Sequence, residues 1–254
     1  MKLVMIEMMS LLHQFLWPFV RVSAMLLTAP IFGTTAINIR TRVAIGAVLT
    51  LLIFQQIDVP AIDPFSFPAL TKMFHEVVVG GLMGLTLQIV SAAVILSGQM
   101  VSNGMGLGMA NMIDPNLGNV PTLSNFFLVI ALLAFLSLGG HLVLISVLVD
   151  SYSAVPIGNG MLSLVSIEGF LGWTSQMFIG AVTLVLPVLV ALLMINVSLG
   201  VISRASPSLN IFAVGFPALI PAGLVLVTLT LTFYYTRLET LWYDSFRFLQ
   251  QSLF

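Results

Sequence analysis

Long apolar segments with very few charges between them constrain this chain more than any other feature of its sequence. The six segments cover residues 11–33, 43–57, 77–110, 126–149, 169–202 and 211–236. Charged residues make up 7% of the chain, against about a quarter in a typical soluble domain. Because so few charges cannot cover a surface exposed to water, lipid or protein partners must contact much of the exterior. We therefore expect an all-α, integral membrane-type protein with a single domain over residues 1–254.

The lengths of the segments do not fit six straight membrane spans. About 20 helical residues cross the hydrocarbon layer of a bilayer, so segment 43–57 is short and segments 77–110 and 169–202 are long. Polar and helix-disrupting residues, which normally face protein or water, also lie inside the segments: Pro18, Arg21, Gln88, Gln99, His141, Pro187 and Asn196. We expect helices that contact mainly other helices, some of them bent into hairpins, with lipid on only part of their surface.

Two stretches outside the apolar segments have a recognisable pattern. Residues 58–68 contain Pro60, Pro64 and Pro68, and prolines at this density predict an extended loop. Residues 237–254 place apolar side chains at near-helical spacing among polar ones: Leu238, Leu241, Trp242, Leu249 and Leu253. That spacing predicts an amphipathic C-terminal tail helix, at a bilayer interface or on a partner.

Motifs of enzymes, metal sites and nucleic-acid-binding proteins are weak in this sequence. His75 and Glu76 begin an H-E-x-x-H motif, but Val79 stands where the second metal ligand belongs. The chain has no cysteine, which excludes disulfides and thiolate metal sites. Eight Lys and Arg residues against nine Asp and Glu leave no basic surface for nucleic acid. We expect no catalytic residue, no cofactor, no resident metal and no nucleic-acid partner.

Pairs of glycines indicate close helix contacts. Gly80 and Gly84 lie one helical turn apart, and Gly104 and Gly108 have the same spacing. Small residues at this spacing let the backbones of two helices approach closely. The second helix belongs either to this chain or to a neighbouring subunit, and the sequence leaves both possibilities open.

Residues 99–121 form the most unusual stretch, because methionines alternate with glycines before a turn. Methionine side chains adapt to varied shapes, and glycines allow backbone conformations that other residues resist. One interpretation is a movable plug or gasket in a conduit, and the other is ordinary filling of gaps in a core. The residues concerned are Met105, Gly106, Gly108, Met109, Met112 and Asp114.

Arg204 follows the fifth apolar segment directly. An arginine in this position either stabilises the end of a helix, where cations are favoured, or pairs with a buried acid. We expect a structural role for it.

Three stretches resemble a known family. Residues 200–217, GVISRASPSLNIFAVGFP, resemble the signature of the FliR family of type III export-gate subunits, S-R-x-x-P-x-x-N-I-F-x-x-G-F-P. Residues 21–32 are similar to the first helix of that family, and residues 98–115 to its glycine-rich loop ending in Asp-Pro. The resemblance covers nearly the whole chain. Its local departure is the enrichment in methionine, at Met105, Met109 and Met112.

The resemblance implies a non-enzymatic core subunit of the flagellar type III export gate, in the inner membrane of a bacterium and within the flagellar basal body. In the family, one such subunit joins several FliP and FliQ subunits in a helical, pore-forming assembly that unfolded proteins cross. Other implied partners are FlhB-like and FlhA-like export components and membrane lipid.

The resemblance also implies roles for particular residues. It places residues 104–114 in the loop that plugs the closed pore. A second set is implied to lie at a structural turn or subunit contact: Arg204, Pro207, Asn210, Phe212, Gly215 and Pro217.

Three other functions stay open at this point. The injectisomes of pathogens use the same motif, although the close match to the flagellar pattern favours flagella. A small-molecule secondary transporter would need acids inside the membrane, whereas Glu76, Asp150 and Glu168 are expected at the edges of segments. A structural scaffold without a pore is the third alternative.

Overall fold

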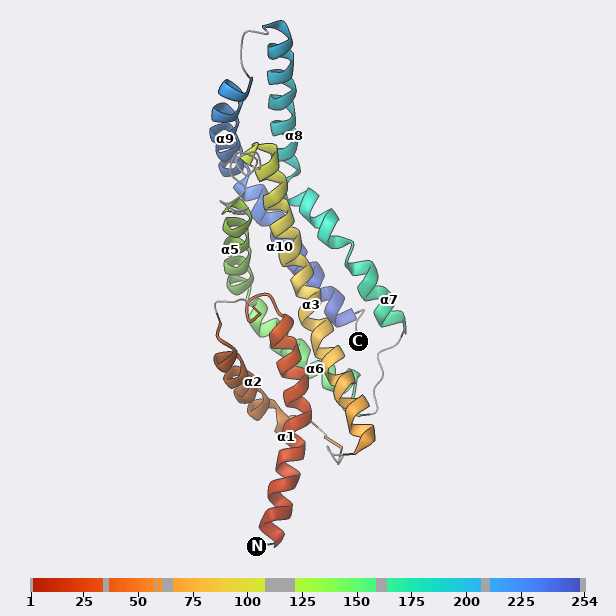
Figure 1. The fold of residues 1–254 in the computed structure, drawn as a ribbon. Coiled ribbons are helices and arrows are strands. Elements are labelled where there is room, and N and C mark those ends of the chain that lie inside the picture. The colour runs from red at the N-terminus through yellow and green to blue at the C-terminus, as the bar shows by residue number, and fades with distance from the viewer. Residues whose placement is uncertain are drawn as a thin grey trace. The chain divides into compact units, whose positions relative to one another are not determined.

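Helices joined by turns make up the whole of the described chain, in which no strand occurs. The structure is a computed structural model and describes residues 2–33, 37–57, 59–60, 66–107, 122–158, 164–206 and 211–251. Of residues 2–10, 13, 122, 164–166 and 211–217 it describes the backbone alone. The α-helices are α1 (Lys2–Thr28), α2 (Ile39–Ile53), α3 (Phe67–Gly104), α5 (Thr122–Ser137), α6 (Gly140–Ala154), α7 (Leu164–Trp173), α8 (Gln176–Ala205), α9 (Ile211–Leu229) and α10 (Leu231–Gln251), and η1 (Phe54–Gln56) is a 3₁₀ turn (Figure 1). The expected all-α class is confirmed.

Several of these helices are long and apolar enough to cross a membrane. By length and composition, three stretches of the described chain meet this condition: Ile39–Gln56, Phe67–Gly104 and Ile167–Ala205. Two bent pairs meet it together, α5 with α6 and α9 with α10, and would raise the number of spans to five. These long apolar helices and bent pairs confirm the expectation of a membrane-type protein.

The beginning of α3 differs from the expectation. This helix runs without a break for 38 residues from Phe67, so the predicted extended loop over 58–68 extends too far. Pro68 lies in the first turn of α3, where its missing N–H costs no hydrogen bond. Because the helix begins before the apolar segment does, Glu76 lies well inside it. The expected position of Glu76 at a segment edge was therefore wrong.

The chain divides into two compact units, each built from segments that lie far apart in the sequence. One comprises Met1–Ile89, Leu138–Thr174 and Tyr243–Phe254, and the other comprises Val90–Ser137 and Ser175–Trp242. We call them the first and the second unit. Neither can form from one continuous stretch of chain. The single domain expected over residues 1–254 stays a prediction.

In the first unit, α1 contacts both α2 and the first half of α3 (Figure 1). Gly46 of α2 lies against Phe19 and Leu26 of α1, where an added Cβ atom would meet their side chains at 3.6 and 3.5 Å. The ring of Trp173 in α7 stacks on Phe248, with 5.0 Å between centroids. Helices α1, α2 and α3 therefore form one core, and α7 contacts the C-terminal part of α10.

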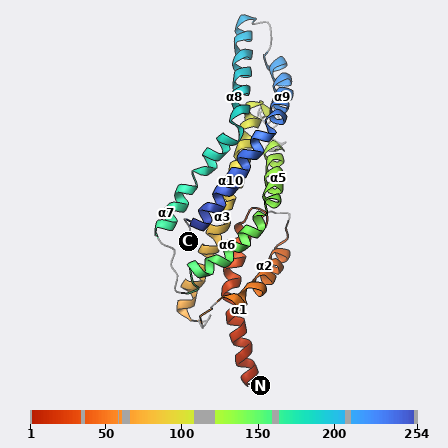
Figure 2. The ribbon, with the colours of Figure 1, turned by 180° about the vertical axis from the view of Figure 1, so that it is seen from behind.

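In the second unit, α8 lies beside α9, as Figure 1 and the reverse view in Figure 2 both show. Aromatic rings join α5 to α10. Phe127 contacts Tyr234 with 4.7 Å between ring centroids, and Phe135 meets Trp242 edge-on at 4.8 Å. These contacts bury the apolar side of α10 in this part of the chain.

Helix α10 covers residues 237–251 of the predicted tail, and residues 252–254 lie outside the described residues. The helix begins at Leu231, before the predicted boundary at residue 237. Leu238, Trp242 and Leu249, from the apolar side of the predicted amphipathic helix, are all buried within this chain. This chain itself therefore covers that part of the apolar side.

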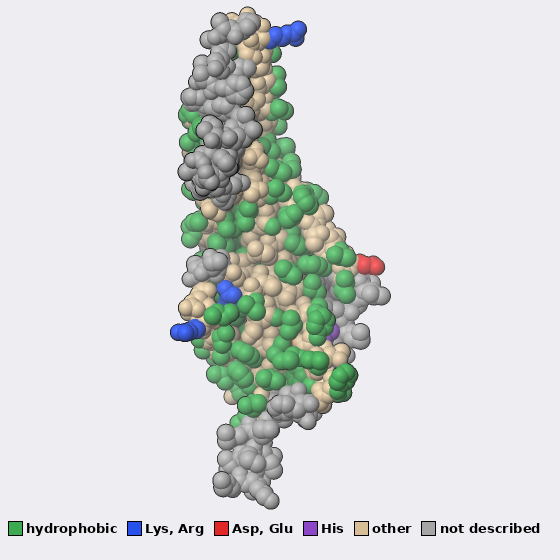
Figure 3. All heavy atoms as spheres, in the orientation of Figure 1, with side chains coloured by type: hydrophobic (Ala, Val, Ile, Leu, Met, Phe, Trp, Pro, Cys, Tyr) green, Lys and Arg blue, Asp and Glu red, His purple; other side chains and the backbone are tan. Residues whose placement is uncertain are grey.

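The exterior carries many apolar side chains. Figure 3 shows hydrophobic side chains spread over much of one face, with few charged groups among them. On α8, eight large apolar side chains are each more than half exposed: Phe178, Ile179, Val190, Leu193, Met194, Val197, Val201 and Ile202. Apolar surface of this extent normally contacts lipid or another protein.

Candidate functional site

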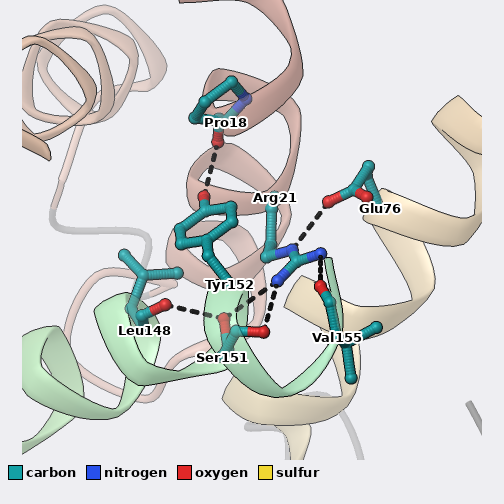
Figure 4. A network of polar contacts seen from close by, with 7 residues as sticks. All are labelled: Pro18, Arg21, Glu76, Leu148, Ser151, Tyr152 and Val155. Carbon is teal, nitrogen blue, oxygen red and sulfur yellow. Dashed lines mark hydrogen bonds and ion pairs between the residues drawn. The ribbon is translucent and has the colours of Figure 1, made fainter. Parts of the chain in front are cut away.

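A buried charged cluster joins three helices of the first unit around Arg21 (Figure 4). Arg21 of α1 donates from Nε to Oε2 of Glu76 in α3, at 2.6 Å. Its Nη1 donates to the carbonyl and hydroxyl oxygens of Ser151 in α6, at 3.0 and 3.1 Å. Its Nη2 donates to the carbonyl oxygen of Val155, at 2.9 Å. We call Arg21, Glu76, Ser151, Tyr152 and Val155 the arginine cluster.

Tyr152 completes this cluster from α6. The guanidinium carbon of Arg21 lies 4.3 Å from the centroid of the Tyr152 ring, a cation–π geometry. The Tyr152 hydroxyl donates to the carbonyl oxygen of Pro18, one turn earlier in α1, at 3.1 Å. One side chain of α6 therefore contacts α1 at two points.

Electrostatics explains why Arg21 is tolerated with no exposure to solvent. The carbonyls of Ser151 and Val155 belong to the C-terminal end of α6, which carries a partial negative charge. The Ser151 carbonyl also accepts from the Val155 amide, at 2.9 Å. Together with the carboxylate of Glu76, the two carbonyls surround the guanidinium with acceptors. Oε1 of Glu76 is buried and has no hydrogen-bond partner among the described residues, so this carboxylate depends on Arg21.

The sequence contains a signal for part of this cluster. Arg21 lies inside an apolar segment, where a charge is costly, and charged groups in such places usually pair with each other. Glu76 was its obvious partner once its helix was known to begin at Phe67. No short motif could have predicted Ser151 and Val155 as partners. Arg21 binds their backbone carbonyls at the end of a helix, and every residue type has a backbone carbonyl.

Gly80 and Gly84 bring α3 into very close contact with α1. A Cβ atom added at Gly80 would overlap the carbonyl oxygen of Arg21, and one at Gly84 would overlap the Thr28 hydroxyl. The Thr28 hydroxyl also donates to the carbonyl oxygen of Gly81, at 3.2 Å. In this structure, the close contact expected from the glycine spacing lies between two helices of the same chain.

The beginning of the glycine-rich segment lies in the second unit. Helix α3 ends at Gly104. Gly108, the other glycine of this spacing, lies outside the described residues, so the predicted packing pair stays a prediction. Met105 is fully buried, and Gly106 has a φ of +78°, a left-handed conformation that glycine adopts without strain. Asn196 of α8 donates from Nδ2 to the carbonyl oxygen of Gly104, at 3.1 Å.

The other residues of the predicted site are described only in part. Arg204 is exposed in the last turn of α8, where the helix dipole favours a cation. Phe212, Gly215 and Pro217 lie in the first part of α9, where the backbone alone is described. The remaining members lie outside the described residues: Gly108, Met109, Met112, Asp114, Pro207 and Asn210.

A family comparison agrees with this arrangement of apolar helices. The family described as Bacterial export proteins, family 1, matches residues 12–245. The chain belongs to this family. The matched residues include the arginine cluster, the glycine contacts of α3 and the end of α3 at Gly104. The family is named for export and not for a catalysed reaction.

Individual relatives carry a more specific name. The Flagellar biosynthetic protein FliR of Pectobacterium carotovorum subsp. carotovorum is 34% identical over 89% of this chain and 87% of its own length. The protein of the same name from Escherichia coli (strain K12) is 34% identical over 87% of this chain and 85% of its own. That from Bacillus subtilis (strain 168) is 29% identical over 87% of both chains. The family resemblance inferred from the motifs is confirmed.

Proposed function

We propose that this chain is a non-enzymatic core subunit of a flagellar type III protein export gate in the bacterial inner membrane. It helps to form and close the pore through which unfolded flagellar proteins leave the cell. One observation carries the proposal: the 34% identity, over 89% of the chain, to a relative named as a flagellar biosynthetic protein. The same name on the other relatives described above favours the flagellar system over an injectisome.

The exposed apolar side chains support an assembly with other subunits. Val197 and Val201 of α8 lie one turn apart, and both are more than half exposed. FliP-like and FliQ-like subunits and lipid would cover such surfaces, with FlhB-like and FlhA-like components as further partners. We expect one copy of this chain in each gate.

Native mass spectrometry tests the proposed assembly. The chain is expressed with and without FliP-like and FliQ-like proteins from the same genome, and the particle extracted in detergent is weighed. We expect a defined hetero-oligomer with one copy of this chain. A stable monomer or homodimer that binds neither partner would contradict the proposal and favour a secondary transporter.

A deletion tests the proposed plug. Residues 104–114 are proposed to close the resting pore, on the strength of the family resemblance and the alternation of glycine and methionine. We expect deletion of residues 106–112 to leave assembly intact and to raise ion leakage, measured as membrane conductance. A Gly-Ser linker of equal length in place of residues 106–112 is the control for chain length. Unchanged conductance in both variants would count against the plug.

A further inference from the structure

The side chain of Met105 occupies a notch in α9 at Gly223. A Cβ atom added at Gly223 would lie 2.5 Å from both Cγ and Cε of Met105 and 2.9 Å from its Sδ. These distances are far shorter than ordinary van der Waals contacts of about 3.5–4.0 Å between carbon atoms. Any side chain at residue 223 therefore competes with Met105 for the same space.

A hydrogen bond from α8 holds the same end of α3. The last carbonyls of a helix lack donors from the helix itself, and the Asn196 amide supplies one to the Gly104 carbonyl at 3.1 Å. Leu192, one turn before Asn196 on α8, also faces this point: a Cβ atom at Gly104 would lie 3.1 Å from its Cδ1.

The left-handed turn at Gly106 follows these contacts immediately. The amide of Gly106 donates to the carbonyl oxygen of Asn103 at 3.0 Å, so the helix closes with a tight turn. Met105 lies inside this turn, directly before Gly106, and has no exposure to solvent. Two helices therefore hold the point at which the chain leaves α3.

We infer that Asn196 and Gly223 are positioning residues that hold the C-terminal end of α3 on α8 and α9 in the closed and the exporting gate alike. Met105 acts as the fixed anchor of this junction, at the beginning of the plug proposed over residues 104–114. The inference rests on the proposed function, because it concerns a gate that closes and opens. It assigns to Met105 a role different from the one that the family resemblance implied.

A disulfide between residues 105 and 223 tests whether the junction stays in place. The chain has no cysteine, so the variant Met105→Cys/Gly223→Cys can form no other intramolecular disulfide. The variant is assembled with its partner subunits in the membrane, oxidised, and assayed for disulfide yield, protein secretion and resting conductance. We expect the bond to form and both activities to match those of the reduced variant. Failure of the bond to form, or secretion that stops on oxidation and returns on reduction, would overturn the inference.

A second set of variants tests the notch itself. Gly223→Leu displaces Met105 and Asn196→Leu removes the donor, so each is expected to raise resting conductance while the mass of the assembled particle stays the same. Adding Met105→Ala to Gly223→Leu returns the lost space and is expected to lower the conductance toward the wild-type value. Conductance that is unchanged in both single variants, or is not rescued in the double variant, refutes the positioning role.

One experiment can refute the proposed function without refuting this inference. Disulfide yield reports on the junction in the membrane whatever the chain does there. A chain that forms the bond, but whose removal from the cell leaves flagellar secretion unaffected, would refute the function and leave the junction as described.

Discussion

Arg21→Leu is expected to be among the most destabilising single substitutions in this chain. It leaves the carboxylate of Glu76 buried without its ion-pair partner, and removes the donors to Ser151 and Val155 at the end of α6. Breaking one side of a buried ion pair typically costs about 3–5 kcal/mol. We expect a large fall in the thermal midpoint of the purified assembly and in the amount of protein in the membrane.

Two further variants show whether the charge is the cause. The double substitution Arg21→Leu/Glu76→Leu removes both charges, and a buried pair replaced by apolar residues is often neutral in stability. We therefore expect it to be more stable than Arg21→Leu alone. Arg247→Leu is the surface control, because its pair with Asp244 is exposed at 3.7 Å and such pairs contribute about 0–1 kcal/mol. If Arg21→Leu is no less stable than Arg247→Leu, the cluster does not hold α1, α3 and α6 together.

Gly84→Ala is expected to destabilise the first unit although alanine is the better helix former. The new methyl group would overlap the Thr28 hydroxyl and lie 2.7 Å from two backbone atoms of α1, the amide nitrogen of Ala29 and the carbonyl oxygen of Met25. Backbone atoms cannot rotate away, so α1 and α3 must separate. Overpacking of this kind costs about 1–3 kcal/mol. The measurement is the thermal midpoint of the purified assembly.

Gly81→Ala is the matched control in the same helix. A Cβ atom at Gly81 would have no neighbour within 4 Å. There, only helix propensity changes, and alanine is favoured over glycine by about 1 kcal/mol. We expect Gly81→Ala to be neutral or stabilising and Gly84→Ala to be clearly less stable. Equal stability of the two variants would mean that α1 does not approach α3 as closely as described.

The apolar pattern of the sequence predicted the class of fold and most of the helices. Segments 77–110 and 169–202 correspond to α3 and to α7 with α8, although the boundaries moved. The pattern did not predict where the other long segments break. Segment 126–149 divides at Gly139, whose φ of +70° begins α6, and segment 211–236 divides between α9 and α10. Each segment is apolar on both sides of its break, so the apolar pattern alone does not mark the bend.

The sequence predicted some parts of the candidate site and not others, for a similar reason. The glycine spacing at residues 80 and 84 indicated a close helix contact, because a one-turn repeat of small residues is visible in one segment. The notch at Gly223 was not predicted, since a single glycine in an apolar helix has no repeat. Its meaning depends on Met105, which reaches it from another helix.

The sequence by itself determined that this chain is helical, apolar on its exterior and a member of an export family. Composition and local motifs suffice for these conclusions, because each depends on residues that are neighbours along the chain. Only the tertiary structure decided that Arg21 pairs with Glu76, 55 residues away, and binds the end of α6. A buried charge requires a partner, but which partner it finds depends on which helices pack together, and the contacts that decide this lie between residues distant in sequence.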